Sequence, residues 1–137
     1  IAEYTRRYGW TFRTIDERQL QTGWFDSDRF FELDIQLSDT FVELRVTLFE
    51  GMHMEWLKSP ELLCYLMGFN ANIKMVRLGL DEGGAIILSC DLSRQDLTYE
   101  VWEQTLGVLG YYSSFLYRDC LRQFWHFGLP STTLQPL

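Results

Sequence analysis

The chain has 137 residues, of which 47% are apolar, 23% charged and 16% aromatic. These proportions are typical of one globular domain, and they exclude a disordered tail, a collagen-like chain and a coiled-coil rod. Twelve basic residues against nineteen acidic ones give a net charge of −7, and only Lys58 and Lys74 are lysines. Nucleic acids and anionic membranes are bound through clustered Lys and Arg, so we expect neither as a partner.

The three cysteines, Cys64, Cys90 and Cys120, are far apart and form no CxxC pair. They predict buried free thiols in a reducing compartment rather than a zinc site or a thioredoxin-like motif. No apolar run approaches the ~18–20 residues that span a bilayer, and no secretory signal is visible. We therefore expect a cytoplasmic protein. The chain begins at Ile1 rather than Met, so an earlier leader stays an open alternative.

Apolar spacing predicts a short helix over residues 1–8 that ends at Gly9. Alternation of apolar and polar residues then predicts a hairpin from 10 to 24. Two further alternating segments, 28–37 and 41–49, predict a second hairpin with a turn at 38–40.

The register of this second hairpin follows from matching its two apolar faces. It predicts three cross-strand pairs: Leu37 with Val42, Ile35 with Leu44, and Asp34 with Arg45. One buried and one wetter face is the pattern of an antiparallel sheet.

The second half begins with a helix that is capped by Ser59 and is expected to end at Gly68. Strands are predicted over 73–80 and 85–92, with a glycine-rich turn between them. A long helix follows Thr98.

Apolar residues continue along this long helix as far as Cys120, at helical spacing. Gly107 and Gly110 weaken it unless another element packs close to them.

The predicted order is helix, two hairpins, helix, hairpin and long helix. Strands outside strict βαβ alternation predict an α+β fold, in which helices lie on one face of an antiparallel sheet of hairpins. We expect a single domain over residues 1–127, followed by a loose C-terminal tail over 128–137.

A set of core and turn positions recurs through the second half of the chain: Leu62-Leu63-x-x-Leu66 with Asn70, Arg77-x-Gly79-Leu80-Asp81-x-x-Gly84, Ile86-Ile87-Leu88, Asp91-Leu92, and Leu97-Thr98-x-Glu100. These positions resemble those of the YbjN-like family, whose fold is that of the type III secretion chaperones. The same pattern is similar to cyanobacterial proteins of unknown function. The resemblance implies a chaperone-like α+β domain, often paired as a homodimer. It implies no reaction and supplies no catalytic positions.

No motif for a nucleophile, a metal or a phosphate loop is present, so we predict neither an enzyme nor a cofactor. The only histidines, His53 and His126, are interpreted as a loop and a packing residue. The acidic pairs Asp81–Glu82 and Asp26–Asp28 are interpreted as turn residues.

The candidate site is aromatic. The register places Phe30 opposite Phe49 on the otherwise polar face, and Phe41 lies on that face too. Exposed together, these side chains form a tentative partner-binding surface, unless the N-terminal hairpin or a helix covers them. A second cluster on the long helix is predicted to be core, and what remains exposed there is a candidate homodimer seam: Tyr111, Tyr112, Phe115 and Tyr117.

The sequence thus favours a non-enzymatic protein-interaction domain, chaperone- or adaptor-like, that binds a protein segment or its own copy through apolar surface. The partner protein is not named by the sequence. The alternative is a small-molecule binding domain with a pocket between the sheet and the long C-terminal helix.

Overall fold

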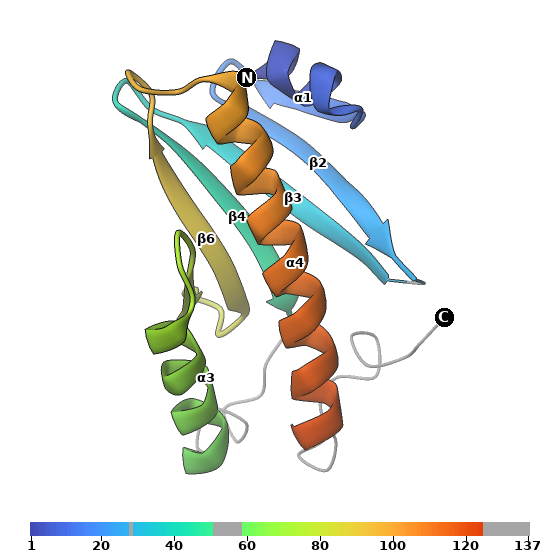
Figure 1. Ribbon diagram of the computed structural model, residues 1–137, viewed down its shortest axis with the longest axis vertical. Helices are drawn as coiled ribbons and strands as arrows, with labels where there is room; N and C mark the ends of the chain where they lie inside the picture. Colours follow the sequence, from blue (N-terminus) through green and yellow to red (C-terminus); the bar gives the residue numbers. More distant parts are fainter. Residues whose placement is uncertain (28, 51–58, 125–137) are drawn as a thin grey trace.

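The computed structural model describes residues 1–27, 29–50 and 59–124, and within them a six-stranded antiparallel sheet packs against one long helix (Figure 1). The strand order is β1-β2-β3-β4-β6-β5. The strands are β1 (Phe12–Asp16), β2 (Gln19–Asp26), β3 (Arg29–Leu37), β4 (Phe41–Phe49), β5 (Arg77–Leu80) and β6 (Ile86–Ser93). The described helices are α1 (Ala2–Tyr8), α3 (Pro60–Asn72) and α4 (Tyr99–Phe124). The predicted α+β class is confirmed.

The predicted register of the β3–β4 hairpin is also confirmed. Leu37 faces Val42 and Asp34 faces Arg45 across the strands. Side chains on one side of this hairpin are completely buried, including Leu33, Ile35, Val42, Leu44 and Val46. The sheet therefore has one apolar face, which must be covered.

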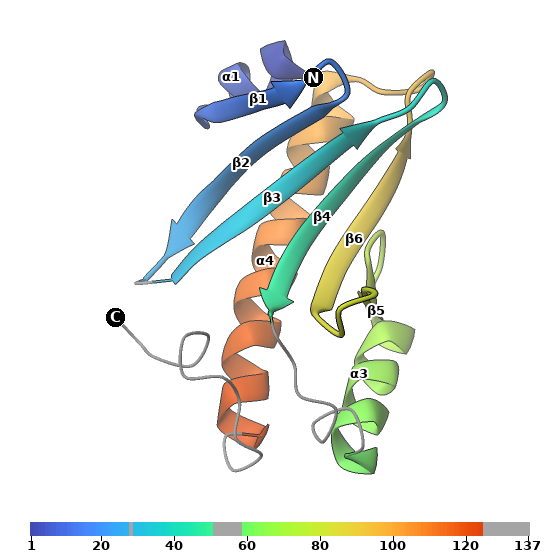
Figure 2. The ribbon, with the colours of Figure 1, turned by 180° about the vertical axis from the view of Figure 1, so that it is seen from behind.

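Helix α4 covers that face along most of its length. Trp102, Leu109 and Leu116 are fully buried between the helix and the strands. Seen from behind, the opposite side of the sheet carries no described helix (Figure 2). We call this opposite side the open face. It presents the alternate, mostly polar side chains of each strand.

Local signals set most of the helix ends. Gly9 ends α1 in the left-handed conformation (φ 95°), which glycine adopts without strain. Ser59 caps α3, since its Oγ accepts a hydrogen bond from the Leu62 amide at 3.3 Å. Thr98 caps α4 through the Val101 amide, also at 3.3 Å. The predicted N-caps are confirmed.

The predicted end of the second helix at Gly68 is wrong, because α3 continues to Asn72. Tertiary contacts of the extra turn explain the difference. The Phe69 ring stacks on Phe115 of α4, at 6.0 Å between ring centroids. The Asn70 side chain accepts a hydrogen bond from the Leu78 amide of β5 at 2.9 Å.

Two of the cysteines are buried as predicted, and all three are free thiols. Burial raises the pKa of Cys120 to about 12. The prediction is wrong for Cys64, which lies exposed on α3.

The interpretations of His53, His126, Asp28 and the tail over 128–137 concern residues outside those that the structure describes. Among the helices described, none is long and apolar enough to cross a membrane.

Candidate protein-binding surface

The three phenylalanines of the predicted surface do not share one environment. Phe30 and Phe41 lie on the open face, 45% and 52% exposed. The prediction for Phe49 is wrong, because this side chain is completely buried and stacks on Tyr117 of α4, with ring centroids 5.2 Å apart. The β4–β6 register shifts between Thr47 and Phe49. Such a bulge moves the following side chain to the other face, which strict alternation does not anticipate.

Phe30 and Phe41 also lie far from each other. They occupy opposite ends of the hairpin, since Phe41 begins β4 beside the turn and Phe30 is near the start of β3. Residue 38, opposite Phe41 in this register, is eight residues from Phe30. At ~3.3 Å per residue the two rings are about 26 Å apart along the strand. The structure therefore provides two separate aromatic positions on the open face.

A neighbour of Phe30 was not predicted as part of the surface. Phe25 of β2 pairs with Phe30 of β3, and the ring centroids are 4.9 Å apart. Phe25 is 73% exposed, among the most exposed large apolar side chains described. The position of Phe25 could have been predicted from the sequence. Trp24 lies on the apolar face, so strand alternation places Phe25 on the open face.

Gly23 explains how the Phe30 ring lies against the sheet. A Cβ atom at this glycine would come within 2.5 Å of Phe30 Cζ and 2.3 Å of the Phe31 carbonyl oxygen. The ring therefore covers the backbone of β2, where no other side chain is accommodated. An aromatic ring over a cross-strand glycine protects the sheet at that point. We call Gly23, Phe25 and Phe30 the aromatic patch.

A shallow cleft of about 400 Å³ borders the patch on the β1 side. Its lining combines backbone, aromatic rings and polar side chains: Thr11, Phe12, Arg13, Gln21, Thr22, Gly23, Phe30 and Glu32. Arg13 donates a hydrogen bond to Gln21, which in turn donates to Asp34 at 2.8 Å. These bonds fix the polar wall across three strands. The cleft thus offers an apolar floor beside a rigid polar wall, an arrangement suited to an extended polypeptide.

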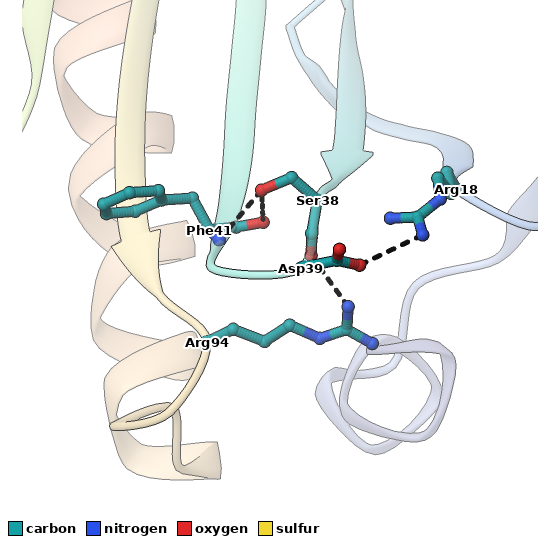
Figure 3. A network of polar contacts seen from close by, with 5 residues as sticks. All are labelled: Arg18, Ser38, Asp39, Phe41 and Arg94. Atoms are coloured by element: carbon teal, nitrogen blue, oxygen red, sulfur yellow. Dashed lines mark hydrogen bonds and ion pairs between the residues drawn. The ribbon is translucent and has the colours of Figure 1, made fainter.

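Phe41 lies at the other end, beside a corner held by polar contacts (Figure 3). The Ser38 Oγ accepts a hydrogen bond from the Phe41 amide at 2.9 Å. Arg94 donates to the Ser38 carbonyl oxygen at 2.7 Å, and Arg18 pairs with Asp39 at 3.1 Å. The corner joins the β1–β2 turn, the β3–β4 turn and the segment after β6. Phe41 is therefore presented from a fixed position.

The aromatic cluster of α4 is divided between core and surface. Tyr117 is buried as predicted, but Tyr111 and Phe115 are 66% and 43% exposed, so the core prediction is wrong for them. The helix turns its Trp102 and Leu109 side toward the sheet. At 3.6 residues per turn, Tyr111 and Phe115 then point away from it.

Clefts elsewhere bear on the small-molecule alternative. A second cleft on the open face, of about 290 Å³, is lined by Phe41 and polar neighbours. A third, of about 250 Å³ and almost wholly apolar, lies between α3 and β5. None of the three lies between the sheet and α4, where buried side chains such as Phe31 and Leu106 fill the space.

Asp81 of the predicted acidic pair accepts hydrogen bonds from the Gly83 and Ala85 amides, as a turn residue does.

Comparison with known proteins gives structural relatives only. No protein-family model matches the chain, and neither does any curated protein sequence. The crystal structure of YbjN from E. coli is similar, with a TM-score of 0.68, 20% identity, and 93% of this chain and 91% of that chain covered. A chain of the ExsC–ExsE complex matches with a TM-score of 0.61 at 20% identity, covering 85% of this chain and 87% of its own.

A third match comes from the heterodimeric ExoU–SpcU complex of the Pseudomonas aeruginosa type III secretion system. Its TM-score is 0.64 at 14% identity, over 86% of this chain and 95% of that chain. The chain has the YbjN-like, type III secretion chaperone-like fold. That expectation from the residues is confirmed, and at these identities it concerns the fold alone.

Proposed function

We propose that this protein is a non-enzymatic, chaperone- or adaptor-like domain that holds a segment of a partner protein on its open face. The observation that carries the proposal is the aromatic patch, two exposed phenylalanine rings on the wall of a rigid sheet beside a cleft. A similar fold occurs in the HopA1–SchA chaperone–effector complex, with a TM-score of 0.60 at 13% identity, which supports the same class of role.

Burial of the two rings supplies the binding energy in this proposal. A phenylalanine side chain taken fully out of water contributes about 1.5–3 kcal/mol. Phe25 and Phe30 are already in contact in the free protein, so their side chains lose little conformational entropy when a partner binds. An apolar side chain of the segment would rest on the patch, and its backbone would run along the cleft.

Phe41 supplies a second, separate contact. The gap of about 26 Å is spanned by an extended segment of about eight residues. Between the two contacts the open face presents both carboxylates and arginines, and Arg45 is paired with Glu43 at 3.4 Å. Glu32 is exposed on this face. Together with the net charge of −7 of the whole chain, it favours a segment that carries basic residues over one that carries acidic residues.

We also propose that the chain associates with its own copy, and that it acts in a reducing compartment such as the cytoplasm. The free thiols of Cys90 and Cys120 are consistent with that compartment.

A tagged pull-down from lysate of the source organism tests the segment proposal. The wild type is compared with Phe25→Ser/Phe30→Ser and with Met67→Ser, a matched control that removes a 75% exposed apolar side chain from α3. We expect a stoichiometric protein partner with the wild type and the control, and its loss with the double variant. Melting temperatures of all three check that the fold is retained.

Two results would overturn the proposal. One is a partner captured equally by the double variant, which would remove the patch from the binding surface. The other is a clean protein that carries a bound metabolite and no protein partner, which would favour the small-molecule alternative.

A further inference from the structure

The Glu32 carboxylate is a charge of the open face that has no partner in the described chain. Glu32 is exposed on β3 and lines the cleft of about 400 Å³ beside the aromatic patch. Within residues 1–27, 29–50 and 59–124, no hydrogen bond or ion pair engages its carboxylate. Its negative charge is therefore free to attract a bound molecule.

The other charged groups around the cleft already offset one another. Arg13 donates to Gln21, which donates to Asp34 at 2.8 Å, so the glutamine joins the arginine to the carboxylate. On the next strand, Arg45 lies opposite Asp34 and pairs with Glu43 at 3.4 Å. The charges of Arg13 and Arg45 are thus compensated by two carboxylates, and the cleft keeps one uncompensated negative charge.

The Phe30 ring lies next to this charge. Phe30 and Glu32 are two positions apart on the same face of β3, which is about 6.6 Å along the strand. The ring is 45% exposed and is held over Gly23, the residue directly opposite Glu32 on β2. Because glycine has no side chain, none from this position of β2 separates the ring from the carboxylate.

We infer that this position receives an arginine side chain of the partner segment. An aromatic face attracts a cation within about 6 Å of its centroid, and a planar guanidinium also stacks on the ring. The same group donates two parallel hydrogen bonds to a carboxylate such as that of Glu32. One guanidinium can therefore use the ring and the carboxylate together. This inference rests on the proposed function and deepens it, because it names a residue that the segment must carry.

The strand geometry also sets where the arginine lies in the segment. The Phe25–Phe30 pair and the Gly23–Glu32 pair follow each other on the open face, about 6.6 Å apart. In an extended segment that runs along these strands, side chains two positions apart have the same separation and point to the same side. An apolar residue on the aromatic patch therefore places the arginine two positions away in the segment.

Selection from a phage-displayed library of random peptides tests this inference. Peptides of about twelve residues are used, longer than the roughly eight residues that span the two aromatic positions. The immobilised proteins are the full chain as wild type, Glu32→Gln, Glu32→Arg and Phe25→Ser/Phe30→Ser. The matched control is Glu82→Gln, which removes an exposed carboxylate from the β5–β6 turn.

We expect the wild type and the control to select peptides with an arginine two positions from an apolar residue. Glu32→Gln should keep the apolar preference and lose the enrichment of arginine, since the ring alone holds a cation weakly. Glu32→Arg should select an acidic residue at that position instead, because the sign of the local charge is reversed. Glu32 is exposed and makes no bond in the described chain, so both variants should melt as the wild type does.

Fluorescence anisotropy of one selected peptide measures the size of the effect. Citrulline in place of the arginine keeps the shape of the side chain and removes its charge. This replacement should weaken binding to the wild type about fivefold. It should weaken binding to Glu32→Gln about twofold or less, because the partner charge is already absent.

The outcomes distinguish this inference from the proposed function. A wild type that selects no peptide, or peptides that bind the Phe25→Ser/Phe30→Ser protein equally well, would overturn the proposed function and this inference with it. Peptides that depend on the aromatic patch but lack an enriched arginine would overturn the arginine site alone. An arginine that stays enriched with Glu32→Gln, or an equal effect of citrulline on both proteins, would do the same.

Discussion

Truncation of Phe49 and of Phe41 should have very different effects on stability, although strict alternation places both side chains on one face. Phe49 is completely buried against Tyr117, whereas Phe41 is 52% exposed. Removing a fully buried phenylalanine costs about 3–5 kcal/mol, of which the ring pair accounts for about 0.5–1.5 kcal/mol. For Phe49→Ala we expect a loss of about 4 kcal/mol. For Phe41→Ala, with half of its surface already in water, we expect about 1 kcal/mol or less.

Urea unfolding followed by circular dichroism measures both free energies. In a domain of this size 4 kcal/mol corresponds to a fall in melting temperature of about 12 °C. If Phe49→Ala does not fold, Phe49→Leu keeps the comparison measurable, with an expected loss of about 1–2 kcal/mol. A loss below about 1 kcal/mol for Phe49→Ala, or a larger loss for Phe41→Ala than for Phe49→Ala, would refute the bulge and the burial it produces.

Three further changes test other parts of the structure. Gly23→Ala should destabilise the protein by about 2 kcal/mol in urea unfolding, because its Cβ meets the Phe31 carbonyl oxygen at 2.3 Å; a neutral effect would contradict the packing of Phe30. Ser59→Ala should lower the free energy of unfolding by about 1 kcal/mol through loss of the α3 cap; an unchanged free energy would contradict the role of Ser59 as a cap. Burial raises the pKa of Cys120 from 9.0 to about 12, so the unfolded chain releases this proton first and stability should fall between pH 9 and 12. Cys120→Ala should flatten that decline, and an identical pH profile would count against the shift.

Much of the fold follows from local sequence. The β3–β4 register could be read from alternation, because a slip of one residue would expose Leu33 and Ile35. The caps at Ser59 and Thr98 depend on hydroxyl groups next to their helices, so they too could be located. The register and the caps depend on residues that are close together in the sequence, so local patterns predict them.

What could not be predicted depends on contacts between distant segments. Helix α3 passes Gly68 because Phe69 and Asn70 find partners on α4 and β5. Phe49 turns inward because β4 pairs with β6 through a bulge. The residues near Phe49 do not indicate that β6 will be the neighbouring strand.

The binding surface could be predicted in part. Alternation places Phe30 on the correct face, and it also marks the companion Phe25, which the predicted surface did not include. Tyr111 and Phe115 of α4 were predicted to be core but are exposed. The apolar stripe of α4 is wide, and helical periodicity alone does not indicate what fraction of such a stripe the sheet covers.

Site-specific photo-crosslinking tests the proposed binding surface most directly. A photoreactive phenylalanine analogue is placed at position 30, within the patch, and in a second sample at position 82, in the exposed β5–β6 turn. After irradiation in lysate of the source organism, we predict crosslinks from position 30 to one segment of one partner protein, well above those from position 82. Equal labelling from both positions, or crosslinks to no protein from position 30, would contradict a segment held on the open face.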